Sequence, residues 1–459
     1  MKDLLQKSIL VAIVVALSMS LLSNNIAPTL GLSLLATAVL VPLAYSIRVP
    51  RDLNSLVLHG LIVRLSAIAA VALLILPYFA ARNSADASYY DNQAGVVVGL
   101  IKSGDWWQIS LNAGTDIVSF VTALIYLPFG PTAVGMTFLS GLLGFVGSLC
   151  FVGAGVASLP RKNLRGYAIF VMMLPSIVFW STLFGKESWV FFGLGITALG
   201  IAQWFRDRKW SSLLKALIGL GVVCLFRPYV ALATALAFAL TALVSRERKA
   251  PLSVTKTITV LLLMAPLIFF MWQSVSSMTG VTEVSGESIV GRITDQGVNT
   301  RLGGGSDVAT TEVHGTREFV YQLPAGAVRL LFRPFPWEAT SPLMFLAALD
   351  NLILIGILVV KHRNVMDTLR HLRTRPFAFF CVVLTIGLTV VFSTIPNLGL
   401  LMREKTQITP FLYVLAFSGN RGVVRRRMPS RRNYARVAWL SRIPDPVTLA
   451  PEGIEVSKT

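Results

Sequence analysis

The residues best suited to chemistry in this chain are three aspartates, Asp86, Asp91 and Asp105, in the polar interval 81–107. Four aromatic side chains lie among them: Tyr89, Tyr90, Trp106 and Trp107. An aspartate inside hydrocarbon costs roughly 2.5–3.5 kcal/mol, and aromatic side chains with one polar end favour the membrane–water interface. We therefore expect this interval to lie at a membrane surface and to supply half of an active site. The alternative for Asp86 is a helix N-cap, because an apolar helical run follows it.

The composition indicates which kind of secondary structure positions these aspartates. Of 459 residues, 54% are hydrophobic and only 14% are charged, which is more apolar surface than a soluble fold can bury. The apolar runs are long and do not alternate, so they favour helices over a strand barrel. We predict an all-α fold: a polytopic helical membrane protein with about 11–13 transmembrane helices, outer-face loops and interfacial helices.

The net charge of +19 is concentrated in short basic segments between the apolar runs and in the C-terminal tail. By the positive-inside rule, segments 161–165, 206–209, 246–249 and 361–375 and the tail lie on the cytoplasmic side. The sequence thus divides into a multi-span domain, 1–418, and a basic, disordered cytoplasmic tail, 419–459. The tail suits anionic lipid headgroups, and nucleic acid is the less favoured partner.

The apolar runs predict the individual spans. The first run follows two lysines like a signal peptide, but more spans follow it, so we interpret it as a retained signal anchor. The 16 residues of 114–129 are marginal for crossing, and counting them as a span conflicts with the positive-inside rule, so a re-entrant or interfacial helix is preferred. Outer loops then cover 81–113 and 276–338, the latter with an amphipathic interfacial stretch at 318–332. The predicted spans are 5–22, 29–47, 60–80, 131–158, 166–183, 188–205, 212–226, 229–245, 257–275, 340–360, 376–396 and 406–418.

Cysteine and histidine give no sign of a metal site. The three cysteines, Cys150, Cys224 and Cys381, lie in apolar runs without metal-ligand spacing, and the four histidines are scattered. A glycine run at 303–305 lacks the lysine of a phosphate loop. The sequence indicates no cofactor, although a divalent-cation requirement stays open.

Several charged residues at span ends fall on the predicted outer side. Alone, each is typical of an interfacial anchor or a locally neutralised pair. Together they bring arginine and lysine, which bind phosphate oxygens, next to carboxylates, as a lipid-linked phosphate or diphosphate requires. Residues 403–405 are expected in a tight hairpin between two spans, and the span centres are expected to be almost free of charge. The predicted substrate-binding residues are Lys186, Glu187, Arg227, Arg333, Glu338, Arg403 and Lys405.

These motifs resemble the GT-C superfamily of membrane glycosyltransferases, in particular the polyprenyl-phosphate-sugar-dependent, protein-mannosyltransferase-like type. Asp86-Ala-Ser-Tyr-Tyr90 is similar to the first outer loop of the family, and 114–130 is similar to the span that follows it. The run 174–187, with Pro-Ser, Trp-Ser and Lys-Glu, resembles a later motif, and 403–411 resembles a C-terminal charged hairpin. One departure is that three apolar runs precede Asp86, where the family usually has one.

The resemblance implies a function. The chain would transfer a sugar from a polyprenyl-phosphate donor to a lipid-linked glycan or another acceptor, on the outer face of the bacterial inner membrane, in cell-envelope polysaccharide or glycoconjugate assembly. Asp86 would be the general base, with Asp91 as the alternative, and Arg333 and Arg403 would hold the phosphate. The candidates for a second acid of the family are Glu187, Asp295, Asp307 and Glu338.

Two other functions stay open. A polysaccharide repeat-unit polymerase or ligase would use the same outer-face arginines on a lipid diphosphate-linked oligosaccharide. A lipid or sugar transporter would show mid-span ionisable residues and inverted repeats, neither of which the sequence indicates, so it ranks third.

Overall fold

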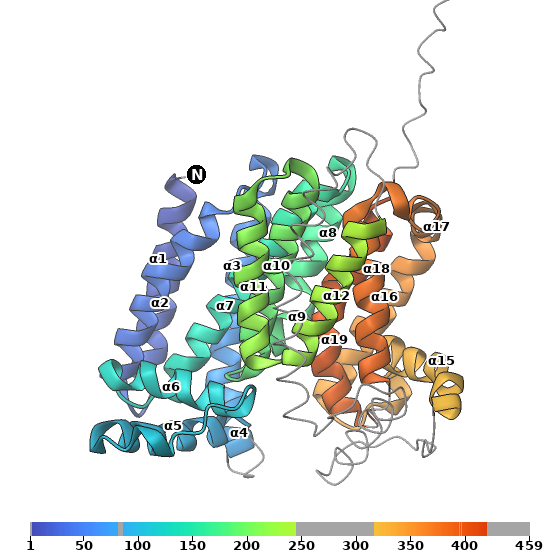
Figure 1. Cartoon of the computed structure of the whole chain (residues 1–459). Coiled ribbons are helices and arrows are strands. Elements are labelled where there is room, and N and C mark those ends of the chain that lie inside the picture. The colour runs from blue at the N-terminus through green and yellow to red at the C-terminus, as the bar shows by residue number, and fades with distance from the viewer. Residues whose placement is uncertain (1, 81–85, 245–315, 394, 396, 420–459) are drawn as a thin grey trace, which may run out of the picture. The chain divides into compact units, whose positions relative to one another are not determined.

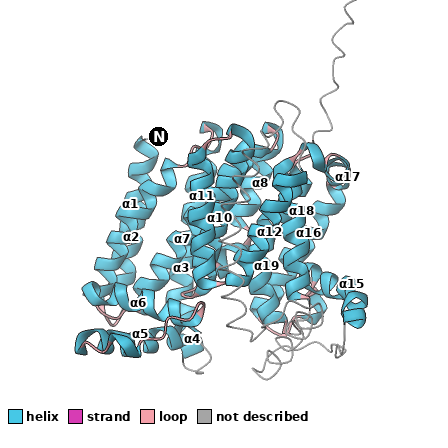
Figure 2. Cartoon of the chain, viewed as in Figure 1, coloured by secondary structure: helices cyan, strands magenta, loops and turns pink. Residues whose placement is uncertain are grey.

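The computed structural model describes residues 2–80, 86–244, 316–393, 395 and 397–419. Within these ranges the chain forms helices without strands, which confirms the predicted all-α fold (Figure 2). Six helical stretches are long and apolar enough to cross a membrane: Asp3–Leu21, Ile26–Ser46, Arg51–Tyr78, Ala133–Ser158, Lys186–Asp207 and Pro342–Val360. These stretches make the chain an integral membrane protein. The predicted span 257–275 and the predicted tail lie outside the described residues, so the number of 11–13 spans stays a prediction.

The helices follow one another in three groups. The first holds α1 (Lys2–Leu21), α2 (Ile26–Ser46), α3 (Asn54–Ala70), a π-helical turn (Val71–Ile75) and α4 (Leu76–Ala80). The second holds α5 (Asp86–Ser103), α6 (Thr115–Phe129), α7 (Ala133–Ser158), α8 (Arg161–Met173), α9 (Pro175–Trp180), α10 (Lys186–Asp207), α11 (Trp210–Phe226) and α12 (Pro228–Val244). The third holds α15 (Thr316–Phe332), α16 (Pro342–Val360), α17 (His362–Arg370), α18 (Pro376–Phe392) and α19 (Leu398–Phe417).

The bundle has two chemically different ends (Figure 1). At the basic end, Arg161 at the start of α8 pairs with Asp52 before α3, at 2.5 Å. Asn163 of α8 also donates to the carbonyl of Phe417 at the end of α19, at 2.8 Å. Three predicted inner segments, 161–165, 206–209 and 361–375, gather at this end, as the positive-inside rule requires. We call the opposite end, where α9 meets α10 and α11 meets α12, the site end.

Helix α6 stays at the site end. Before it, the Gly114 N–H donates to the carbonyl of Leu225 in the last turn of α11, at 3.0 Å. After it, the carbonyl of Pro131 accepts from Asn25 in the α1–α2 connection, at 2.9 Å. Both partners lie at the site end (Figure 1), and about 22 Å of helix falls short of a hydrocarbon core of about 30 Å. Both flanks of α6 therefore lie at the same end of the bundle, which supports the prediction of a re-entrant or interfacial helix at 114–129.

In two segments the helices begin and end at residues other than those predicted. The predicted span 166–183 is interrupted at Leu174, because Pro175 lacks an N–H and starts the separate helix α9. The hairpin predicted at 403–405 is wrong. Helix α19 begins at Leu398, where the side chain of Asn397 accepts from the Leu400 N–H at 3.0 Å. The three charges therefore lie inside a helix and are buried or half-buried.

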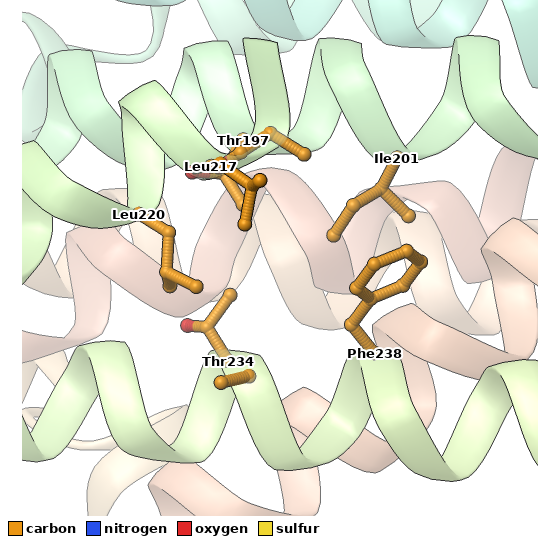
Figure 3. A pocket seen from close by; sticks show the side chains of 8 residues that line it. Thr197, Ile201, Leu217, Leu220, Thr234 and Phe238 are labelled. Carbon is orange, nitrogen blue, oxygen red and sulfur yellow. Dashed lines mark hydrogen bonds between the residues drawn. The ribbon is translucent and has the colours of Figure 1, made fainter. Parts of the chain in front are cut away.

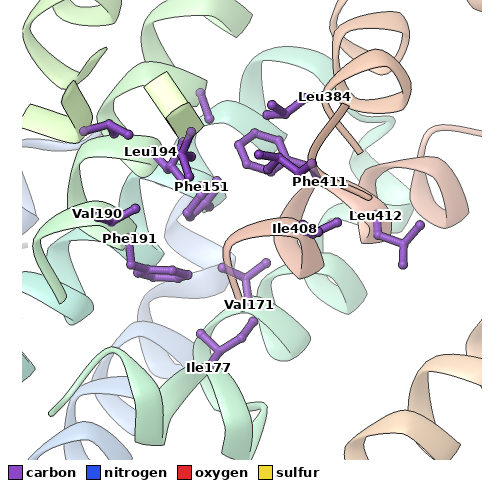
Figure 4. Close-up of a cluster of buried hydrophobic side chains, with 14 of the residues drawn as sticks. Phe151, Val171, Ile177, Val190, Phe191, Leu194, Leu384, Ile408, Phe411 and Leu412 are labelled. Carbon is purple, nitrogen blue, oxygen red and sulfur yellow. The ribbon is translucent and has the colours of Figure 1, made fainter. Parts of the chain in front are cut away.

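Aromatic and aliphatic side chains fill the space between the central helices (Figure 4). The ring of Phe151 on α7 contacts those of Phe191 on α10 and Phe411 on α19, with both centroid distances at 5.2 Å. Helices α7 and α10 approach closely, since a Cβ at Gly195 would lie 2.5 Å from the carbonyl oxygen of Gly147. This packing fixes α7, α10 and α19 against one another, and two of these helices carry site residues.

The expectation that span centres carry almost no charge is wrong at two positions. Arg64 of α3 is 1% exposed, and Asp350 of α16 is 5% exposed. The Arg64 guanidinium donates to the Val178 carbonyl at 2.8 Å and to the hydroxyls of Ser181 and Thr182 at 2.5 and 3.1 Å. These acceptors lie in α9 or in the α9–α10 connection, so Arg64 anchors the segment that precedes Lys186.

We predict that Arg64→Lys lowers the melting temperature of the detergent-solubilised protein, corresponding to a loss of about 2 kcal/mol or more. A single ammonium cannot replace the guanidinium fork, so it leaves a buried charge with too few partners. The control is Arg161→Lys, because the side chain of Arg161 is 68% exposed and its pair with Asp52 contributes little. Equal melting temperatures for both variants and the wild type would contradict this role.

Candidate functional site

The site is organised by three consecutive residues of α19, Arg403, Glu404 and Lys405. Successive residues of a helix are rotated by about 100°, so these three side chains leave α19 in different directions. Each meets a different part of the chain: Arg403 meets Asp86 of α5, Glu404 meets Arg227, and Lys405 meets the last turn of α15. Less than one turn of α19 therefore joins most of the predicted site residues.

At the centre, the Arg227 guanidinium lies between two carboxylates. It donates to Oε1 of Glu187 at 2.9 Å and pairs with Oε2 of Glu404. The three residues are 5%, 7% and 3% exposed, so the ions are shielded from water. Gln407, one turn beyond Glu404, donates to the same carboxylate at 2.7 Å. The triad ties the first turn of α10 and the α11–α12 connection to α19.

The outer part of the site is the pair Arg403–Asp86. Nη2 of Arg403 donates to Oδ2 of Asp86 at 2.5 Å, while its Nε lies 3.9 Å from Oε1 of Glu187. The guanidinium lies over the ring of Trp180, 5.3 Å from its centroid. The side chain of Asp86 is 51% exposed. Its carboxylate is thus held in place by a charge-assisted bond and stays open to a ligand. The bond to Arg403 favours the ionic interpretation of Asp86 over the N-cap.

Lys186 is the cation of this group with no carboxylate within 4.0 Å among the described residues. Its Nζ donates to the hydroxyl of Thr115 at the start of α6, at 2.8 Å. Arg227 and Arg403 already face Glu187, Glu404 and Asp86. Lys186 therefore keeps an ammonium charge, half-buried, for an incoming anion.

Tyr90 is a site residue that the sequence analysis placed only among interfacial aromatics. It lies one turn after Asp86 in α5 and is 5% exposed. Burial and then the nearby carboxylates of Glu187 and Asp86 raise the pKa of Tyr90 well above its ordinary value. Its phenol therefore stays neutral at physiological pH. The sequence contained one indication of this role: Tyr90 follows Asp86 by four residues, a spacing that places both side chains on the same face of α5.

Asp91 points elsewhere. Five helical positions rotate it by about 140° from Asp86, and its Oδ1 accepts a hydrogen bond from the Tyr126 hydroxyl of α6. The structure does not bring it to the Arg403 group. Asp91 instead joins the two interfacial helices, which makes Asp86 the better placed of the two candidate bases.

Arg333, Glu338 and Lys405 form a second group. Arg333 makes a bidentate pair with Glu338, with distances of 2.5 and 3.1 Å, and Glu338 also accepts from the Phe335 N–H at 2.8 Å. The bond from Arg333 holds the pKa of the Glu338 carboxyl below its usual range, and the backbone N–H adds to this. Because Glu338 neutralises Arg333 locally, the predicted partnership of Arg333 with Arg403 on one phosphate has no direct geometric support.

Lys405 links the second group to α19. Its ammonium donates to the carbonyl of Leu331 and to Oδ1 of Asn351, whose amide donates to the carbonyl of Pro334 at 2.9 Å. The predicted residues therefore form two groups that share one stretch of helix. Among the acids considered as a second acid, Glu187 lies in the Arg403 group, whereas Asp295 and Asp307 lie outside the described residues.

Other features of the described chain offer no competing site. Within it, no group of three or more His, Cys, Asp or Glu side chains is arranged to hold a metal ion. An apolar cavity between α10, α11 and α12 is lined by residues such as Ile201 and Phe238 (Figure 3). The hydroxyls of its Thr197 and Thr234 bond to carbonyls of their own helices, at 2.8 and 2.7 Å. This cavity is a packing gap without reactive groups.

Comparison of the chain with protein-family models, with curated proteins and with solved structures finds no significant match. The side chains and their geometry are therefore the basis for inferring a function.

We predict that Arg227→Gln destabilises the protein by about 3–5 kcal/mol, because it leaves Glu187 and Glu404 buried without their cation. Adding Glu404→Gln to that variant should restore part of the loss. Chemical unfolding in detergent would measure both effects. Arg333→Gln is the control, because the Arg333–Glu338 pair is more exposed, and its loss should lower the free energy of unfolding by about 1 kcal/mol or less. Additive losses in the double variant would contradict the triad.

The Arg333–Glu338 pair should show a pH dependence. A carboxyl with a lowered folded-state pKa stabilises the fold above its unfolded pKa of about 4.5, and this contribution is lost as the pH falls through the folded value. We therefore expect the wild type to have a higher melting temperature than Glu338→Gln at pH 7, and we expect the difference to shrink as the pH falls below about 4.5 and to vanish below the folded-state pKa. A difference that grows toward low pH would refute the assignment.

Proposed function

We propose that this chain is a membrane glycosyltransferase of the GT-C kind, which transfers a sugar from a polyprenyl-phosphate donor to a hydroxyl of a lipid-linked glycan or other acceptor. The observation that carries the proposal is the exposed carboxylate of Asp86, which Arg403 holds near Lys186, an ammonium with no carboxylate within 4.0 Å among the described residues. A base and an anion-binding cation, both at a membrane surface, are what such a transfer needs.

The reaction would proceed in one displacement. The acceptor hydroxyl attacks the anomeric carbon of the sugar, and the bond between that carbon and the phosphate oxygen breaks. The phosphate leaves with the electron pair, and the hydroxyl proton passes to Asp86. Its Oδ2 is bonded to Arg403, so Oδ1 is the oxygen available to take the proton.

Two cations are placed to hold the leaving phosphate. Lys186 offers a charge that no carboxylate within 4.0 Å offsets among the described residues, and Arg403 presents a guanidinium whose side chain is 24% exposed. Arg227 is buried between Glu187 and Glu404, where it stabilises the arrangement of the site residues. This assignment moves the proposed phosphate contact from Arg333 to Lys186 and keeps Arg403.

The location of the site supports an outer-face reaction. Basic segments gather at the other end of the bundle, and in membrane proteins such segments lie on the cytoplasmic side. Asp86 and the interfacial helices α5 and α6 would then face the outer leaflet of a bacterial inner membrane. A lipid-borne donor could reach them from the bilayer.

Transport, the third of the candidate functions, is favoured by one observation: Arg64 and Asp350 lie inside apolar helices, where ionisable groups mark substrate or ion paths. Arg64, however, has four hydrogen-bond partners from the protein itself. That arrangement is typical of an anchor, so transfer remains the preferred function.

We expect Asp86→Asn to lower kcat by about 10²–10⁴, as the loss of a general base does. The assay follows radiolabelled sugar from polyprenyl-phosphate donors with different sugars in liposomes. Asp105→Asn is the matched control, since Asp105 belongs to the same polar interval but bonds to Ser103 at 2.7 Å. Lys186→Gln should weaken donor binding and raise KM. Full transfer by a correctly inserted Asp86→Asn protein would remove Asp86 from the chemistry.

A donor comparison separates transfer from polymerisation. Activity with a lipid diphosphate-linked oligosaccharide, and none with single-sugar polyprenyl phosphates, would favour the polymerase or ligase. Substrate movement across the liposome membrane without bond formation would favour transport.

A further inference from the structure

A polar pocket lies between α9, α16 and α19, and Lys405 is one of the residues that line it. Asp350 is the ninth residue of α16, about 12 Å along the helix from its start at the site end. The pocket is bounded by both polar and apolar side chains: Leu174, Ser176, Ala347, Asp350, Asn351, Leu354, Met402, Lys405, Thr406, Thr409 and Tyr413.

Two polar atoms of the pocket have no hydrogen-bond partner among the residues that the structure describes. Oδ2 of Asp350 accepts from the Ser176 N–H at 2.6 Å and from the Ser176 hydroxyl, but Oδ1 of Asp350 accepts none. The hydroxyl of Tyr413 is likewise unpaired, although Tyr413 is 0% exposed and Asp350 is 5% exposed. A buried polar atom left without a partner is costly, and two such atoms on residues that line the same pocket indicate a ligand between them.

The charges and the size of the pocket limit what that ligand is. The ammonium of Lys405 opposes a metal cation, and the carboxylate of Asp350 opposes an anion. The free space between the side chains is large enough for a water molecule and too small for a sugar ring. A small neutral molecule that both donates and accepts hydrogen bonds meets these conditions, and water is that molecule.

We propose that this pocket is a hydrated proton-binding site, in which ordered water joins Oδ1 of Asp350 to the Tyr413 hydroxyl and the Lys405 ammonium. Water in contact with a carboxylate lets it take up and release a proton, which an isolated buried carboxyl cannot do. Ionisable residues in apolar helices serve such proton exchange in other membrane proteins. Tyr413 and Lys405 are the titratable groups that line the pocket with Asp350.

The position of Lys405 makes the pocket relevant to the ion network. The ammonium of Lys405 lines the pocket together with Asp350, and Lys405 directly follows Glu404, the partner of Arg227. The protonation state of Asp350 therefore changes the electrostatic environment of Lys405, the charged residue next to the Arg227 triad. This inference does not depend on glycosyl transfer, because the pocket lies apart from Asp86 and Lys186.

Radiolytic hydroxyl labelling tests the water directly, because X-rays generate the radical from water bound beside the side chain. We expect Tyr413 and Met402 of the intact protein in detergent to be labelled several-fold faster than Tyr167. Tyr167 is the matched control, since its hydroxyl is also buried and unpaired but does not line the pocket. Equally slow labelling of Tyr413 and Tyr167 would overturn the proposal.

Infrared difference spectra between acidic and neutral pH test the proton. We expect a carboxylic-acid carbonyl band that shifts in D₂O and is lost in Asp350→Asn but kept in Asp207→Asn, an acid at the basic end paired with Arg206. Asp350→Leu, which removes the polar partner, should also slow the labelling of Tyr413. A band that survives Asp350→Asn, or unchanged labelling in Asp350→Leu, would show that Asp350 is not the proton-binding group.

Discussion

The arrangement of this protein depends on the burial of Arg227 between Glu187 and Glu404. The cost of removing three charges from water is large, and it is offset only while all three groups stay in contact. Because the partners come from α10, from the α11–α12 connection and from α19, the triad fixes the relative rotation and depth of these helices. Arg403, 3.9 Å from Glu187, brings a further positive charge to the network.

The rest of the site follows from this constraint. Once Glu404 faces Arg227, the helical rotation turns Arg403 toward Asp86 and Lys405 toward the last turn of α15 and Asn351 of α16. The buried part of the network is rigid, and its open part presents Asp86 and Lys186. Preorganised charges of this kind stabilise a developing anion without rearrangement, which is the physical basis of the proposed transfer.

The fold class and the charged residues of the site could be predicted from the sequence. Long apolar runs indicate membrane helices, and charges at the ends of such runs are few, so Asp86, Glu187, Arg227 and Arg403 were singled out. Their pairing could not be predicted, because it depends on how the helices rotate and pack. Arg333 illustrates this limit, since its partner Glu338 is only five residues away.

Other errors have local causes. The charges at 403–405 suggested a hairpin because three charged residues in a row are unusual inside a membrane helix. They lie inside α19 because they pair with residues on other helices, and the local sequence does not show these partners. Arg64 and Asp350 are single charged residues within apolar runs. The average hydrophobicity of each run is so high that these residues did not change its interpretation as a span without charges. The position of α6 was indicated by its short length and by the conflict that a crossing at 114–129 creates with the positive-inside rule.

The central claim is that Asp86 and Arg403, 317 positions apart, meet at one end of the bundle. Cysteines at both positions, in a chain whose three native cysteines are replaced, can be treated with a short bismaleimide and analysed by mass spectrometry. The structure predicts a cross-link between positions 86 and 403 and none between 86 and 161, which lies at the basic end. A cross-link from 86 to 161, or none to 403, would contradict it.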